Sequence, residues 1–106
     1  MISFQDFQKM RLVVGRIVSV EDHPDADKLY VMKIDIGGEQ RQSVAGLKPY
    51  LTPEELVGKL VAVVANLEPA TLRGMESQCM ILAAQEGDKV VVLTPASEIA
   101  VGSTIR

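Results

Sequence analysis

An adjacent pair of glycines, Gly37-Gly38, most constrains the fold because it separates two segments that alternate in polarity. In the segment 30–36, tyrosine, methionine and isoleucine occupy every second position, a period that is typical of a strand with one buried face. Two glycines between such segments favour a two-residue hairpin turn, which needs positive φ at both positions. The sequence therefore predicts a strand over 30–36 and an antiparallel partner over 39–45, on which Arg41 and Ser43 share a face.

Further strands and a short helix are predicted on either side of this hairpin. The segment 12–20 is rich in valine and isoleucine and predicts a first strand, with a bulge or a close backbone approach at Gly15. Thr52-Pro53-Glu54-Glu55 has the residues of an N-cap, a first turn and a capping box, which indicates a small helix. The segment 68–78 is predicted to be a loop. The remaining strands are predicted from three apolar segments: 60–65, 79–84 and 90–93.

Five main strands with a small helix between the third and the fourth indicate an all-β fold, the five-stranded OB-fold barrel. A short N-terminal helix with Ser3 as its N-cap is predicted over 4–10, and C-terminal extension strands follow the barrel. Residues 1–106 form a single domain by length. Because the N-terminal helix is too short to be stable alone, its Phe4 and Phe7 face is expected to dock on the domain's own core or on a partner chain.

Composition narrows the class of protein. The formal net charge is -3, so the chain lacks the strongly basic character of domains that bind nucleic acid mainly through phosphate charge. The net charge does not exclude a contact with nucleic acid that is made by a few local cations. The single cysteine, Cys79, cannot form an internal disulfide and is expected to be a small core residue. With no paired thiols and no apolar run of membrane-spanning length, the expected location is cytoplasmic and no membrane contact is predicted.

Catalysis and metal binding find little support in the sequence. One histidine and one cysteine give no obvious pair of nucleophile and base, so we predict no catalytic residue and no cofactor. His23, Asp25 and Asp27 can be read as a cluster of metal ligands. However, aspartate is common in proline-containing turns, where it caps the backbone. We therefore predict no metal site and interpret these three residues as loop architecture.

Three cations lie on or beside the predicted hairpin. Lys28 stands at the entrance to the strand over 30–36 and is flanked by a polar loop, where a cation is well placed to contact a ligand. Lys33 and Arg41 lie on the two strands that the glycine turn joins, and we predict that they sit near each other on one face. In OB folds the second and third strands and their neighbouring loops form the ligand-binding face.

The predicted loop over 68–78 carries a further candidate group. Arg73 stands beside a glycine, where a guanidinium can fork onto a phosphate. Asn66 and Ser77 flank the loop and can hydrogen-bond to phosphate, sugar or base edges; alternatively, they cap a strand end and close a turn. Outside the N-terminal helix only Tyr30 and Tyr50 are aromatic, and Tyr30 is expected in the core, so general binding of single-stranded DNA by base stacking is disfavoured.

Five motifs occur in order along the chain: HPDADKLYVMKIDIG, RQSVAG, VVANLEP, LRG and SQCMILAA. In these motifs the chain resembles the tRNA-binding OB domain family, which includes the C-terminal domain or separate β subunit of methionyl-tRNA synthetases, free-standing tRNA-binding proteins and the endothelial monocyte-activating polypeptide II domain. The resemblance covers residues 4–106 and implies an OB barrel that binds tRNA at the outer corner of its L, by shape and with little regard to sequence. A branch of the same fold family resembles peptide-binding export chaperones, which gives an alternative function.

The resemblance implies a non-catalytic tRNA-binding protein, either free-standing or an accessory to methionyl-tRNA synthetase. Small family members resemble homodimers joined through their terminal elements, so residues 1–11 and 95–106 are expected at a dimer interface. Two cations that are common in the family are absent here, within Leu12–Gly15 and at Thr71. The positions where the motifs imply contact with tRNA are Lys28, Asn66, Arg73, Ser77 and Met80, and the strand argument adds Lys33 and Arg41.

Overall fold

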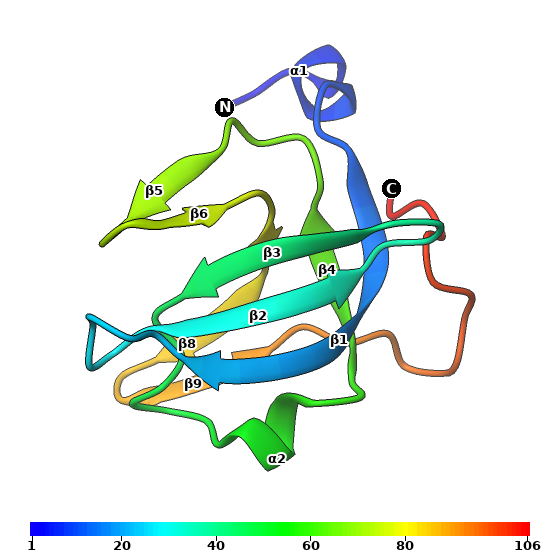
Figure 1. The fold of residues 1–106 in the computed structure, drawn as a ribbon. Helices are drawn as coiled ribbons and strands as arrows, with labels where there is room; N and C mark the ends of the chain where they lie inside the picture. Colours follow the sequence, from blue (N-terminus) through cyan, green and yellow to red (C-terminus); the bar gives the residue numbers. More distant parts are fainter.

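A curved antiparallel sheet is the centre of the computed structural model, which describes residues 1–106 (Figure 1). Its five strands, in spatial order, are β3 (Gln40–Ala45), β2 (Tyr30–Asp35), β1 (Leu12–Asp22), β4 (Leu60–Val64) and β7 (Met80–Ile81). Two separate hairpins are formed by β5 (Ala70–Leu72) with β6 (Met75–Ser77) and by β8 (Ala83–Glu86) with β9 (Lys89–Val92).

The two edges of the curved sheet are connected by the segment that leads from β6 into β7. The backbone N–H of Gln78 donates to the carbonyl of Gln42 at 2.7 Å, and Ser43 Oγ donates to the carbonyl of Cys79 at 3.2 Å. Because β3 and β7 are the edge strands of the sheet, these bonds close it into a barrel around the apolar core. The predicted all-β, OB-type fold is therefore confirmed.

The hairpin between β2 and β3 turns as predicted. Gly37 and Gly38 have φ of 92° and 80°, and the N–H of Ile36 donates to the carbonyl of Glu39 at 3.0 Å. The isoleucines and the methionine of the alternating segment point inward and are almost completely buried. Positive φ at both turn positions is readily adopted by glycine, which explains why this pair fixes the turn so strongly.

The same turn fixes the register of the two strands. Lys33 pairs with Gln42, and Ile34 pairs with Arg41. Residues directly opposite each other share a face, and neighbours along a strand point to opposite faces. Lys33 therefore lies on the outer face and Arg41 on the other, so the prediction that the two cations share a face was wrong. A register shifted by one residue would have been needed to bring them together.

The first strand, β1, pairs with β4 along its first half and with β2 along its second. Its register shifts between Ile17 and Ser19, so the bulge lies there and not at Gly15, where it was predicted as one of two alternatives. The other alternative, a close backbone approach, is confirmed. A Cβ at Gly15 would lie 2.9 Å from side-chain atoms of both Ile34 and Val63. Glycine is therefore needed for β1 to pack against the core.

The helix α2 (Pro53–Leu56) lies between β3 and β4, as predicted. Both bonds of its capping box are present: Thr52 Oγ1 accepts from the N–H of Glu55 at 3.3 Å, and Glu55 Oε1 accepts from the N–H of Thr52 at 2.9 Å. The hydrogen bonds from Thr52 lower the pKa of the Glu55 carboxyl. Leu56 is fully buried and anchors the helix to the barrel.

The N-terminal helix α1 (Phe4–Gln8) has the predicted N-cap, since Ser3 Oγ accepts from the N–H of Asp6 at 3.1 Å. None of its residues is buried, and Phe4 is 71% exposed. Phe7 is half-buried against the domain, whereas Phe4 is uncovered, so the domain's own surface covers only part of the apolar face of this helix. Neither helix of the chain has the length and apolar character needed to cross a bilayer.

Two segments differ from the sequence prediction. The predicted loop over 68–78 contains the β5–β6 hairpin, with Arg73-Gly74 at its turn. The apolar run over 79–84 is divided at Leu82, so that β7 pairs with β4 whereas β8 pairs with β9. Every residue of β5 is exposed, so this strand has no alternation of buried and exposed positions that the sequence could reveal.

The chain end returns to β1. The N–H of Gly102 donates to Val14 at 2.7 Å, Val14 donates to Ser103 at 2.9 Å, and Ile105 donates to Leu12 at 2.9 Å, all to backbone carbonyls. This segment forms an isolated bridge on the edge of β1 that β4 leaves free.

Candidate nucleic-acid interface

The loop between β1 and β2 and the β5–β6 hairpin lie beside each other and are joined by two hydrogen bonds (Figure 1). His23 is 5% exposed, and its Nδ1 accepts from the N–H of Asp25 at 2.9 Å. Nε2 therefore carries the proton and donates to the carbonyl of Leu72 at 2.9 Å. In return, Arg73 Nη2 donates to the carbonyl of Asp25 at 3.1 Å. Each segment thus contributes one side chain that binds the backbone of the other.

These two segments carry Lys28 and Arg73, both exposed. Neither is in an ion pair: the four ion pairs of the molecule involve other cations. Lys28 makes no side-chain hydrogen bond, and the bond to Asp25 uses one of the five donors of Arg73. Both cations are therefore free to bind an anion, and they lie on segments that are already held together.

The backbone of Arg73 is unusual. Its φ is 52°, which makes it the only non-glycine residue of the chain with positive φ. Asparagine followed by glycine is strongly preferred at the centre of such two-residue turns. For most side chains this conformation costs about 1–2 kcal/mol. Strained positions of this kind concentrate at functional sites, which points to a role for the arginine side chain.

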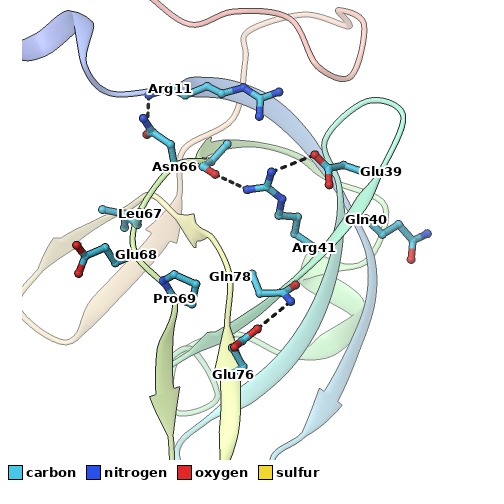
Figure 2. Close-up of a pocket in the computed structure, with 11 residues that line it drawn as sticks. Arg11, Glu39, Gln40, Arg41, Asn66, Leu67, Glu68, Pro69, Glu76 and Gln78 are labelled. Carbon is cyan, nitrogen blue, oxygen red and sulfur yellow. Dashed lines mark hydrogen bonds and ion pairs between the residues drawn. The ribbon is translucent and has the colours of Figure 1, made fainter.

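A second group of predicted residues lines a hollow of about 560 Å³ between β3, β6 and the segment after β4 (Figure 2). The guanidinium of Arg41 donates to the carbonyl of Ala65 and to Glu39 Oε1, the latter at 3.0 Å. Glu68 and Glu76 line the same hollow, so its charge is mixed. Arg41 is already bound by its neighbours and is less available to a phosphate than Lys28 or Arg73.

Asn66 lies in this hollow and has a structural role, because both atoms of its amide bond to the protein backbone. Its Oδ1 accepts from the N–H of Arg11, and its Nδ2 donates to the carbonyl of Lys9, each at 2.7 Å. These bonds join the end of β4 to the connection between α1 and β1, which corresponds to the strand-capping alternative. The structure also places Arg11 at the hollow, with no ion pair or side-chain hydrogen bond. The sequence prediction missed Arg11, since no motif marks it.

Lys33 lies on the outer face of the β2–β3 hairpin and connects to the second hairpin through one residue. Its Nζ donates to Gln42 Oε1 at 2.7 Å, and Gln42 Nε2 donates to the carbonyl of Glu76 at 2.7 Å. Lys33 itself is exposed. The outer face of β2 and β3 is therefore continuous with β6.

Ser77 and Met80 have different roles in the structure. Ser77 Oγ accepts from the N–H of Val44 at 3.0 Å and donates to the carbonyl of Cys79 at 3.2 Å, so it helps to close the barrel. Met80 is 44% exposed on the wall of an apolar hollow of about 200 Å³, together with Leu72. Cys79 is buried in the apolar core, which confirms the prediction for this cysteine, and this burial raises the pKa of its thiol.

The family model of the putative tRNA-binding domain matches residues 12–104. The chain belongs to this family. A methionine-tRNA ligase from Pyrococcus furiosus is 56% identical over 105 residues, which make up 99% of this tRNA-binding domain and 14% of that relative.

Two solved structures are similar over the whole chain. A MetRS related protein from Pyrococcus horikoshii has a TM-score of 0.93 and 33% identity, with 100% of this chain and 98% of that chain covered. A CsaA chaperone protein from Picrophilus torridus has a TM-score of 0.91 and 33% identity, with 100% of both chains covered. The resemblance found in the sequence motifs is therefore confirmed at the level of the family and of the fold.

Proposed function

We propose that this tRNA-binding domain binds the outer corner of tRNA by shape, with little regard to sequence, and that it acts in the cytoplasm without catalysing a reaction. The observation that carries this proposal is the pair of Lys28 and Arg73, which have no acidic partner and lie on two segments bonded to each other. Lys33 extends the same surface along β2. Cations contact phosphates, and such contacts position an RNA without reading its bases.

The uncharged polar side chains also support this proposal, because they are bonded within the protein. The side chains of Asn66, Ser77 and Gln42 each bond to the protein itself through their polar atoms, which fixes their orientation. Reading a base edge requires a free donor or acceptor at a fixed place. Among the polar residues predicted to contact tRNA, those whose side chains keep several free donors are the cations Lys28 and Arg73, and this favours recognition of the backbone.

The number of free cations determines the affinity for tRNA that we expect. If three or four phosphates are contacted, the slope of log affinity against log salt is about -3 and the affinity is modest. A weak module of this kind is useful as an accessory, because linking it to an enzyme raises the effective concentration of tRNA. The similarity to a methionine-tRNA ligase supports methionyl-tRNA synthetase as the enzyme, whether the domain is free-standing, a subunit or part of a longer chain.

We also propose a homodimer joined through residues 1–11 and 95–106. The support is the uncovered apolar side of the N-terminal segment, where Ile2 is 72% and Phe4 71% exposed. Light scattering at micromolar concentration tests this proposal, and a mass equal to one chain contradicts it.

A peptide-binding export chaperone is the second candidate function. It is favoured by the similarity to a CsaA chaperone protein and by the apolar hollow beside Leu72 and Met80. The free cations next to this hollow favour tRNA as the ligand. Capture of an unfolded polypeptide, together with no binding of tRNA at low salt, would establish the chaperone function and overturn the first proposal.

Filter binding with bulk tRNA across a series of salt concentrations tests the main proposal. We expect Lys28→Ala to lower the affinity about tenfold and the salt slope by about one unit. Lys59→Ala is the matched control, because Lys59 is also exposed and has no ion pair. It follows α2, and this helix lies on the opposite side of the barrel from the β5–β6 hairpin (Figure 1). Equal affinities for wild type, Lys28→Ala and Lys59→Ala would remove Lys28 from the interface.

A further inference from the structure

His23 is one of two buried polar side chains in the molecule, and both of its ring nitrogens are engaged. The bond to the N–H of Asp25 lies within the β1–β2 loop, whereas the bond to the carbonyl of Leu72 reaches the β5–β6 hairpin. The ring is therefore shared between the two segments that carry Lys28 and Arg73. Its burial keeps it from contacting an RNA directly, and its nitrogens have no lone pair left for a metal ion.

We infer that His23 is a positioning residue for tRNA binding: its ring holds the β1–β2 loop against the β5–β6 hairpin, so that Lys28 and Arg73 form one preformed pair of cations. This inference rests on the proposed function. It assigns to the histidine of the HPDADKL motif a task that neither a metal ligand nor a simple loop residue performs.

The other bonds of the loop show why His23 decides its position. The N–H of His23 donates to the carbonyl of Leu29 at 3.1 Å, and the N–H of Leu29 donates to the carbonyl of Ala26 at 3.4 Å. These bonds shape the loop internally but do not attach it to the hairpin. Attachment depends on the buried His23 bond and on the exposed Arg73 bond.

The two attachments differ in what tRNA binding does to them. Arg73 is exposed and must turn some of its donors toward a phosphate, so its bond to Asp25 competes with the ligand. The bond from His23 is buried and does not compete. Without it, the loop and the hairpin have to be ordered relative to each other when RNA binds, and that loss of conformational freedom weakens binding.

Two variants separate the two bonds of the ring. In His23→Asn, the side-chain oxygen occupies the place of Nδ1 and accepts from the N–H of Asp25, but the side chain is too short to reach Leu72. In His23→Gln, the side-chain nitrogen occupies the place of Nε2 and donates to Leu72. Both variants are neutral, so neither changes the charge that the RNA meets.

We expect His23→Asn to bind bulk tRNA about tenfold more weakly than wild type, and His23→Gln to remain within about threefold, since only the former leaves the loop to be ordered on binding. The loss of tRNA affinity caused by Lys28→Ala should also depend on whether His23 is present. We expect a loss of about tenfold in wild type and about twofold in His23→Asn, because Lys28 is not held in position when the loop is no longer attached to the hairpin. Equal affinities for the two His23 variants, or an equal cost of Lys28→Ala in both backgrounds, would overturn the inference.

A measurement on the unmutated chain covers the case in which His23→Asn does not fold. Amide hydrogen exchange of Asp25, whose N–H the ring accepts, reports whether the loop is ordered before tRNA binds. We expect protection in the free protein and little change with tRNA; exchange that is fast until tRNA is added would overturn the inference.

Failure of this inference can be distinguished from failure of the proposed function. If wild type binds no tRNA at low salt, the proposed function fails. If Lys28→Ala weakens binding but the His23 variants do not, only the inference about His23 fails.

Discussion

Replacing Arg73 by asparagine should separate binding from stability, because the two properties make opposite demands on this position. Arg73 occupies the left-handed region at φ 52°, and the following glycine completes the turn with φ 88°. Asparagine followed by glycine is the preferred pair for such a turn, whereas most other residues lose about 1–2 kcal/mol there. Arg73→Asn therefore relieves backbone strain and removes one cation in a single step.

The expected change in stability follows from two contributions. Relief of strain adds about 1 kcal/mol to the free energy of unfolding. Loss of the exposed bond to the carbonyl of Asp25 subtracts about 0.5–1 kcal/mol. We therefore expect a free energy of unfolding between the wild-type value and about 0.5 kcal/mol above it, which corresponds to a melting temperature up to about 3 °C higher.

The expected change in binding is larger and has the opposite sign. A charge-assisted bond to phosphate contributes about 1.5–3 kcal/mol, so the affinity for bulk tRNA should fall about 10- to 150-fold. The salt slope should become shallower by about one unit. Urea unfolding and filter binding measure the two properties independently, and Lys59→Asn serves as the control for charge. Wild-type affinity and slope would refute the role of Arg73 in binding, and a clear loss of stability would refute the strained turn.

Three further predictions concern stability and assembly. Gly15→Ala should lower the free energy of unfolding in urea by about 1–3 kcal/mol, since its Cβ would lie 2.9 Å from two core side chains, whereas the control Gly46→Ala, with its nearest neighbour at 3.9 Å, should not. Because the bonds from Thr52 lower the pKa of Glu55, that carboxylate stabilises the fold above the ordinary value of 4.5 and loses this contribution as the pH falls through its folded pKa. Glu55→Gln should therefore reduce the melting temperature at pH 7, and this deficit should shrink as the pH falls through the folded pKa of Glu55; a deficit that does not change with pH would contradict this. Phe4→Glu should halve the mass measured by light scattering if α1 lies at a dimer interface.

Features that depend on neighbouring residues could be predicted from the sequence. The glycine pair at 37–38 has one preferred turn, and the capping box around Thr52 is complete within four residues. Both were confirmed, and together they place the hairpin and α2 in an OB order. The internal geometry of β1 is harder to predict, because a glycine in a strand signals either a bulge or a close approach, and only packing against Ile34 and Val63 decides between them.

Features that depend on distant partners could not be predicted. The opposite faces of Lys33 and Arg41 are an exception, because the predicted two-residue turn already implies the pairing of Lys33 with Gln42, and a difference of one residue reverses a side chain. The structural role of Asn66 is set by Arg11, far away along the chain, and the role of His23 is set in the same way by Leu72. Whether a polar residue is free for a ligand is therefore decided by tertiary structure.

The position of β1 has a consequence for how fast the domain folds. This strand pairs with β2, with β4 and with the segment around Ser103, so its partners are spread over nearly the full length of the chain. Each pairing closes a long loop before it gains any stabilising contact, and barrels built in this way fold in milliseconds to seconds. Until the last residues reach β1, one edge of this strand is unpaired and open to pairing with other chains. Self-association during refolding should therefore decrease when the protein concentration is lowered.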